Sequence, residues 1–158
     1  MVAEQMMQLV YLSRVTQPID ARELSRIQNA SVRNNQRTRI SGFLMYRSGC
    51  FLQFLEGRPS KLLPLKERIA ADPRHTDFEI VYEGVQPRRL TAGWDMAVFN
   101  LDALSPHFAI DGDPRLPLLD ALLSVHHLNV EGSDALRVAV AEWRERLVAS
   151  AVRIEDAA

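Results

Sequence analysis

The chain has 158 residues, of which 47% are hydrophobic, so it can bury one core and is expected to form one domain with an extension. Its 19 basic and 20 acidic residues nearly cancel and form no long run of one sign, which gives no reason to expect nucleic acid or an anionic membrane as a partner. Cys50 is the only cysteine, no His/Cys spacing suggests a metal site, and no segment approaches the roughly 20 apolar residues of a membrane span, so we expect a cytoplasmic protein without disulfides or zinc.

A strand and a helix are expected at the start of the chain. The segment 6–13 is short and β-prone, and Tyr11 lies on one of its two faces. Asp20 and Glu23 have the spacing of a capping box, so a helix is expected from about residue 21 to residue 34.

The inward stripe of this helix begins apolar and ends polar. Its members at helical spacing are Leu24, Ile27, Ser31 and then Asn34 or Asn35. Two interpretations of the asparagines remain open. They contribute to a site, or one of them closes the helix in the left-handed conformation that asparagine tolerates.

An apolar run between Gly49 and Gly57 carries one carboxamide, Gln53, at its centre. The run is typical of a buried strand, and residues 40–46 form a neighbouring strand joined to it by a hairpin-length turn. Burying a carboxamide without partners costs roughly 1–3 kcal/mol, so Gln53 needs a specific donor and acceptor. Either it bridges core groups, or its amide acts as a switch, because reversing the amide exchanges donor and acceptor without a change of shape.

The second half of this region repeats the pattern. A helix is expected over 59–71, with Pro64 delaying its start or bending it, and strands follow over 77–85 and 94–99. The order strand, helix, strand, strand, helix, strand, strand is the ferredoxin-like α+β arrangement, with both helices on one face of a mostly antiparallel sheet. Tyr11, Gln53 and the polar end of the first helix then enclose a cavity suited to a ligand with carbonyl and ring N–H groups.

Two amphipathic helices are expected after residue 101. Residues 115–128 place Leu116, Leu119, Leu123 and His126 on one side, and residues 134–152 place Leu136, Val140, Trp143, Leu147 and Ala151 on one stripe. The simplest arrangement is that these helices cover the sheet face that the first two leave bare. We therefore divide the chain into a ligand-binding domain over 1–101 and a two-helix extension over 102–158.

Five segments together resemble one known family, because they occur in its order and at its spacing. They are 9–13 (LVYLS), 34–35 with 40–46 (NN, ISGFLMY), 51–57 (FLQFLEG), 72–75 (DPRH) and 93–96 (GWDM). The chain is identified as similar to BLUF domains, the blue-light sensors using flavin, from about residue 8 to residue 101. The resemblance implies that the cavity binds FAD, or alternatively FMN, between the two helices.

The family pattern also implies roles for individual residues. Tyr11 is hydrogen-bonded to Gln53, and Gln53 to the flavin N5/C4=O edge. Asn35 also reaches the C4=O edge, while Asn34 and Arg68 reach the other carbonyl and N3–H. Around the ring pack Ile27, Ile69 and His75, and Asp72 orients Arg68. Light then moves an electron and a proton from Tyr11, and their return leaves the Gln53 amide reversed, which shifts absorption to the red. Trp94 and Met96, expected on the last strand, either carry the signal outward or are plain core.

No catalytic cluster is present, so the resemblance implies a sensor that is not an enzyme. We expect it to signal to a separate, unidentified effector protein and to form a homo-oligomer, with no nucleic acid or membrane partner. Two alternatives are an acylphosphatase, for which Arg14 is present but residues 15–19 lack the glycine-rich loop, and a flavin-free ferredoxin-like interaction module. Tyr11, Gln53 and Asn35 argue against the second alternative.

Overall fold

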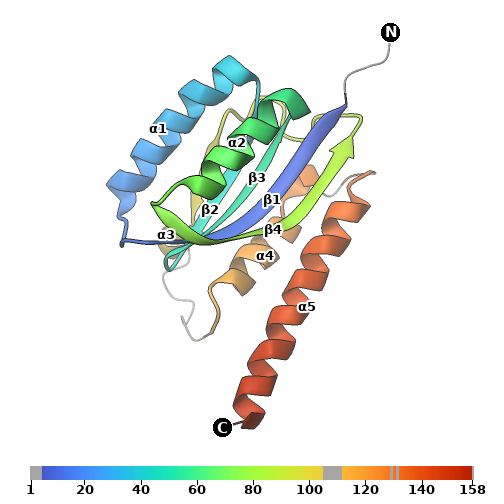
Figure 1. Cartoon of the computed structure of the whole chain (residues 1–158). Coiled ribbons are helices and arrows are strands. Elements are labelled where there is room, and N and C mark those ends of the chain that lie inside the picture. Colours follow the sequence, from blue (N-terminus) through green and yellow to red (C-terminus); the bar gives the residue numbers. More distant parts are fainter. Residues whose placement is uncertain (1–4, 105–111, 129, 131, 158) are drawn as a thin grey trace.

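A computed structural model describes residues 5–104, 112–128, 130 and 132–157. Five strands and two helices alternate in the expected order, and further helices follow (Figure 1). The elements are β1 (Met6–Val15), α1 (Ala21–Thr38), β2 (Ser41–Arg47), β3 (Cys50–Gly57), α2 (Pro59–Ala71), β4 (His75–Gln86), β5 (Ala97–Asn100), α3 (Leu101–Leu104), α4 (Arg115–Leu123), the 3₁₀ turn η1 (His126–Leu128) and α5 (Asp134–Ala157).

The strands form one sheet in the order β4-β1-β3-β2-β5. The first four strands pair antiparallel, and β5 runs parallel to β2, which confirms the ferredoxin-like α+β prediction. The β2–β3 hairpin turns through Ser48 and Gly49, both with positive φ (45° and 83°), as a two-residue turn between twisted strands requires.

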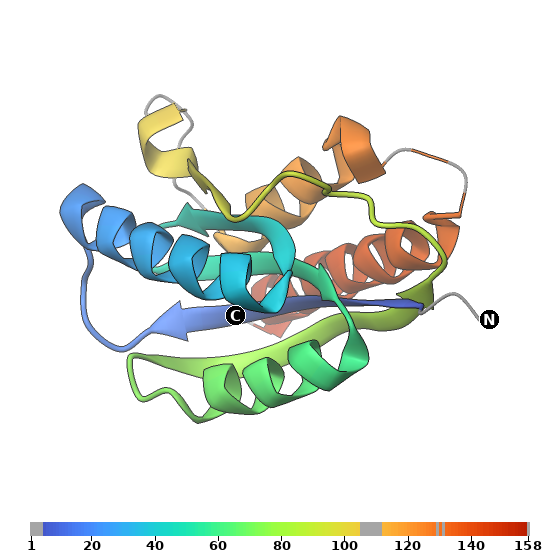
Figure 2. The same cartoon turned by 90° about the horizontal axis from the view of Figure 1, so that it is seen from above.

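Helices cover both faces of the sheet (Figures 1 and 2). One core lies between the sheet and α1 and α2, and includes Leu9, Leu24, Leu44, Leu55 and Leu62. The other lies between the sheet and α4 and α5, and includes Leu12, Phe43, Phe54, Leu119 and Val140. Because side chains of a strand alternate between faces, β1 and β3 each contribute to both cores.

Helix α1 continues beyond the asparagines that were one candidate for its end. Asp20 caps its start, with the side chain accepting from Glu23 N at 2.9 Å, as the capping-box pattern predicted. The helix ends at Thr38, and Arg39 adopts the left-handed conformation (φ 55°) with its N–H donating to Asn35 O. The interpretation that Asn34 or Asn35 closes the helix is therefore wrong.

Three other details differ from the sequence-based expectations. Helix α2 begins directly after Arg58, because Pro59 fits the first helical position, and Pro64 lies inside it. The last strand starts only at Ala97, so Trp94 and Met96 precede it in the β4–β5 connection. In α4 the buried residues are Leu118, Leu119 and Leu122, since the helix stops at Leu123 and leaves His126 exposed in the 3₁₀ turn. The side chain of Ala151 lies outside the described residues.

Candidate functional site

A buried tyrosine–glutamine pair lies on the sheet face beneath α1 and α2. Tyr11 and Gln53 are direct partners across β1 and β3, and their side chains are 5% and 7% exposed. The Tyr11 hydroxyl donates a hydrogen bond to Gln53 Oε1. Two adjacent strands thus fix both side chains at one point of the sheet, as the alternation pattern predicted.

The hydrogen bond from Tyr11 defines the orientation of the glutamine amide in this structure. Burial, and to a smaller extent the negative charge of Asp72, raises the pKa of the Tyr11 phenol well above its usual value. The phenol therefore keeps its proton and donates it to the Gln53 oxygen, although a neutral phenol can equally accept a hydrogen bond from a reversed amide. Gln53 Nε2 then points the other way and lies 3.4 Å from Met96 Sδ, a weak acceptor.

The segment that carries Met96 is tied to α1 by three hydrogen bonds. Asn35 Nδ2 donates to the carbonyl of Asp95 at 2.5 Å, Gln28 Nε2 donates to the carbonyl of Met96 at 3.1 Å, and Gln36 Nε2 donates to Asp95 Oδ2 at 3.1 Å. Asn35 is the buried member of the asparagine pair, at 4% exposure. The polar end of the α1 stripe therefore meets a backbone segment next to Gln53.

Trp94 and Met96 lie on opposite sides of the sheet. Met96 belongs to the core under α1 and α2, whereas Trp94 packs in the core under α4 and α5. The Trp94 ring lies 4.5 Å from the ring of His127 in η1 and 5.9 Å from that of Phe43. Residues 94–96 thus connect the surroundings of Gln53 with the C-terminal helices.

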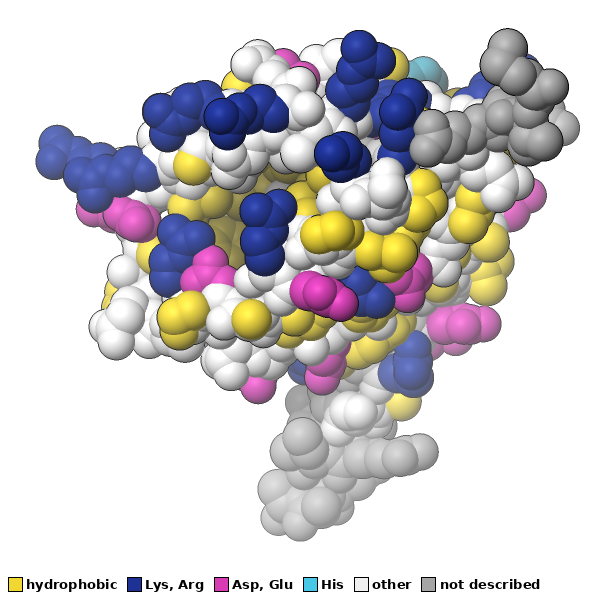
Figure 3. Space-filling view, turned by 45° about the horizontal axis from the view of Figure 1, so that its top comes forward, with side chains coloured by type: hydrophobic (Ala, Val, Ile, Leu, Met, Phe, Trp, Pro, Cys, Tyr) yellow, Lys and Arg dark blue, Asp and Glu magenta, His cyan; other side chains and the backbone are white. Residues whose placement is uncertain are grey.

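A hollow between α1 and α2 is lined by apolar side chains that the protein leaves half-buried (Figure 3). Ile27 of α1 and Leu65 and Ile69 of α2 pack against the core around Tyr11 and remain partly exposed. The His75 ring hydrogen-bonds through Nε2 to the carbonyl of Ile69, and its centroid is 6.3 Å from that of Tyr11. His75 thus lies beside Ile69 and Tyr11, and the packing of Ile27, Ile69 and His75 around a ligand stays a prediction.

The remaining predicted residues, Asn34, Arg68 and Asp72, are exposed or partly exposed. Asn34 and Arg68 are exposed, and their contact with a ligand stays a prediction. Among the described residues, Asp72 is bound by Arg74. Its carboxylate accepts from the backbone N–H and the guanidinium of Arg74, with Arg74 Nη2 2.6 Å from Oδ2, and this bonding lowers the pKa of Asp72. The partner of Asp72 in this structure is Arg74, and the role of Asp72 in orienting Arg68 stays a prediction.

Sequence reasoning missed a buried polar network on the opposite sheet face. Glu56 is fully buried and accepts from Thr91 N, from Thr91 Oγ1 at 2.7 Å and from Gln8 Nε2 at 3.3 Å. Arg89 donates to Ser41 Oγ at 2.8 Å beside it. This network fastens the beginning of the β4–β5 connection to the sheet. A signal was present, since Glu56 and Gln8 interrupt otherwise apolar strands.

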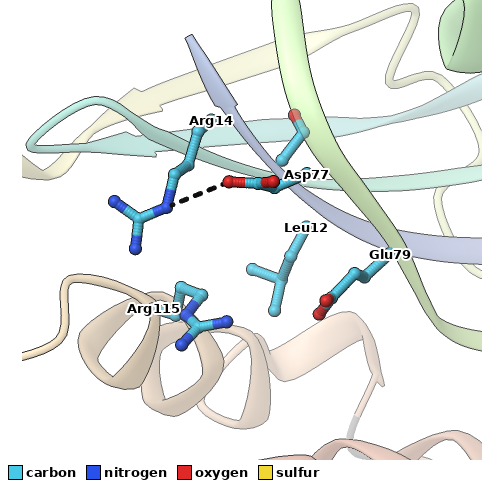
Figure 4. Close-up of a pocket in the computed structure, with 6 residues that line it drawn as sticks. Leu12, Arg14, Asp77, Glu79 and Arg115 are labelled. Atoms are coloured by element: carbon cyan, nitrogen blue, oxygen red, sulfur yellow. Dashed lines mark ion pairs between the residues drawn. The ribbon is translucent and has the colours of Figure 1, made fainter.

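A second cavity, of about 210 Å³, lies on the face of α4 (Figure 4). Leu12, Arg14, Asp77, Glu79 and Arg115 point toward it, and Arg14 Nε lies 3.7 Å from Asp77 Oδ2. Because two arginines and two carboxylates share the cavity, their charges cancel and select neither an anion nor a cation. Within the described residues, no cluster suited to a metal ion occurs, and no helix is long and apolar enough to cross a membrane.

The fold and site define an α+β domain in which two helices lie over a buried tyrosine–glutamine pair on one face of the sheet. A sequence profile of the BLUF family, sensors of blue-light using FAD, matches residues 6–97. Over 89 residues the chain is 37% identical to a photoactivated adenylate cyclase subunit beta of Euglena longa, a match that covers 56% of this chain and 10% of that protein.

Solved structures agree with this match. A bacterial light-regulated adenylyl cyclase superposes with a TM-score of 0.59 and 31% identity, over 75% of this chain and 33% of the other. BlrB, a BLUF protein in its dark state, superposes with a TM-score of 0.62 and 25% identity, over 89% of this chain and 98% of that one.

The chain belongs to the BLUF family, whose members are described as sensors of blue-light using FAD. It spans about a tenth of the length of the curated cyclase subunits that it matches.

The residues present fit a flavin. Apolar side chains from α1 and α2 suit the two sides of a flat ring system, and the Gln53 amide suits its polar edge. Ser13, which pairs with Phe51 across β1 and β3, is 3% exposed, and its Oγ has no partner among the described residues. A buried hydroxyl in that state is expected where a ligand or water supplies the missing hydrogen bond.

Proposed function

We propose that the Gln53 amide is the light-driven switch of this sensor and that Tyr11 is its electron and proton donor. The observation that carries the proposal is the buried chain Tyr11 Oη to Gln53 Oε1 and Gln53 Nε2 to Met96 Sδ. One side of the amide has a strong partner and the other a weak one. Reversal of the amide therefore has a defined starting state and meets little resistance at Met96.

FAD is the cofactor we propose, with FMN as the alternative, because the family description names FAD. Ile27, Ile69 and His75 would pack against its ring, Asn35 and Gln53 would face the C4=O edge, and Asn34 and Arg68 would reach the remaining polar edge. Asp72 would contribute to the edge of the flavin site by holding Arg74. When bound, flavin supplies blue-light absorption and an excited state that accepts an electron.

The chain's own groups then perform the switching. Tyr11 releases the proton at Oη toward Gln53 Oε1 as it gives up an electron to the excited cofactor. It recovers the proton and the electron when the charges recombine. The amide ends reversed, with Nε2 toward Tyr11 and the oxygen away from it. Met96 Sδ can no longer accept a hydrogen bond from this amide, so the hold on residues 95–96 changes while the pocket keeps its volume.

We further propose that residues 102–158 form a two-helix extension that receives this change from the flavin-binding part, residues 1–101. The contact of Trp94 with His127 supports this route, because Trp94 lies two residues from Met96 and on the other face. Couplings between sites are typically 1–3 kcal/mol, which suits a shift in helix packing or in an oligomer equilibrium. The chain would act as a homo-oligomer that binds a separate effector protein, without catalysis of its own.

The cofactor proposal is tested on purified protein. Flavin released by mild denaturation and separated by chromatography should be FAD in equimolar amount, and a content of FMN alone contradicts the choice of cofactor. The route is tested by hydrogen exchange in darkness and under blue light. Protection should change in residues 94–99, in α4 and in α5; changes confined to the flavin pocket would leave the extension without a role in signalling.

A further inference from the structure

Four arginines form a stripe along the exposed side of α1. Arg22, Arg26, Arg33 and Arg37 are spaced by 4, 7 and 4 residues, and all four are exposed. At about 100° per residue these positions fall within roughly 60° of one another, and at 1.5 Å per residue the stripe is about 22 Å long. In Figure 3, arginine and lysine side chains gather along the upper rim of the molecule, above the hydrophobic hollow.

The stripe concentrates positive charge on a molecule that is otherwise acidic. Residues 21–39 contain five arginines and one glutamate, a net charge of +4, whereas the whole chain has −1, so the rest carries −5. Arg26 pairs with Glu23 at 3.3 Å, and Arg22, Arg33 and Arg37 form no ion pair with the described residues. Clustered like charges repel one another at some cost to the helix, so the stripe is better explained by a partner than by stability.

We propose that this stripe, Arg22–Arg26–Arg33–Arg37, is a docking surface for an acidic helix of a partner protein, and that light modulates the docking. Carboxylates at the same 4-7-4 spacing on one helix face would meet the four guanidinium groups in register. An anionic membrane fits poorly, because α1 exposes no large hydrophobic side chain for insertion. Nucleic acid fits poorly, because a duplex would also approach the net negative remainder of the chain.

A short connection links the stripe to the switch, and this part of the inference rests on the proposed function. Gln36 lies beside Arg33 and Arg37 in a shallow concavity and donates to Asp95 Oδ2 at 3.1 Å. Asp95 precedes Met96, the residue that accepts from Gln53 Nε2. Reversal of the Gln53 amide therefore alters the partner of Met96, then the position of Asp95, and through Gln36 the surface between the two C-terminal arginines.

The test uses the flavin-loaded full chain and a fluorescent helical peptide with glutamates at 4-7-4 spacing. A peptide with glutamines at those positions is the control ligand, and fluorescence anisotropy is measured in darkness and under blue light. The variant Arg33→Gln/Arg37→Gln should bind the glutamate peptide roughly fivefold to tenfold more weakly, since exposed ion pairs contribute about 0.2–1 kcal/mol each. The matched variant Lys61→Gln/Arg88→Gln removes the same charge from exposed positions outside the stripe and should bind within about twofold of the wild type.

The outcomes are distinct. Equal losses in the two double variants, or no preference for the glutamate peptide, overturn the docking surface, and tighter binding of a duplex DNA of similar length overturns the partner class. The wild type should bind differently in light and darkness, and Gln36→Ala should abolish that difference while the absorption shift remains. Identical binding in light and darkness by wild-type protein that still shows the shift overturns the coupling alone, because the shift reports the proposed function separately.

Discussion

The two single variants that each remove one partner of the Tyr11–Gln53 hydrogen bond should together lose more unfolding free energy than the double variant that removes both partners. Tyr11→Phe leaves Gln53 Oε1 without its donor, and Gln53→Leu leaves the Tyr11 hydroxyl without its acceptor; both residues are less than 10% exposed. An orphaned buried polar group costs about 1–3 kcal/mol, so each single variant should lose that much unfolding free energy. The double variant should lose less than the sum, by roughly 0.5–3 kcal/mol.

Urea unfolding at one fixed excess of FAD measures this cycle, since bound ligand adds to stability by mass action. A matched cycle combines Gln53→Leu with Tyr82→Phe, because Tyr82 belongs to the core on the opposite sheet face. That cycle should be additive within about 0.3–0.5 kcal/mol. If the Tyr11 cycle were equally additive, the two side chains would not act as one hydrogen-bonded unit, and the starting state of the switch would be wrong.

Three further predictions concern the surroundings of the switch. Glu56→Ala should lower the unfolding free energy by about 2 kcal/mol or more, because Thr91 and Gln8 lose their acceptor. Glu56→Gln should lose less, because a reversed Gln8 amide would present to the new amide the Oε1 that has no partner among the described residues; equal urea midpoints for the two variants would refute this. Burial keeps the Tyr11 pKa above that of the unfolded phenol, so its contribution to stability is complete below about pH 10 and declines as pH rises further; urea curves at about pH 9 and about pH 11 should show a larger decline in wild type than in Tyr11→Phe, and equal declines would contradict it. Gly42→Ala should destabilise by about 1–3 kcal/mol, since its φ is 153° and a Cβ would overlap the Phe54 carbonyl; an unchanged melting temperature would refute this.

Local patterns predicted the sheet and its first two helices because the relevant signals lie close together in sequence. Alternation placed Tyr11 and Gln53 on one face, the capping box at Asp20 marked the start of α1, and the glycine-bounded run marked β3. Each of these features depends on neighbours within a few residues.

The errors arose where contacts between residues far apart in the sequence determine the structure. The connection before β5 is held by α1 and by the buried Glu56, so Trp94 and Met96 precede the strand on which they were expected. The prediction of which α4 side chains face the core was wrong, because a short helix rich in leucine can bury any of its leucines against the sheet.

The most direct test of the switch is the light-minus-dark absorption spectrum of the flavin-loaded wild type and of Gln53→Leu. The wild type should shift to longer wavelength under blue light and return in darkness. Gln53→Leu should retain flavin, because it conserves much of the side-chain volume, and should show no such shift. A dark-reversible shift of normal size in Gln53→Leu would contradict the assignment of Gln53 as the switch.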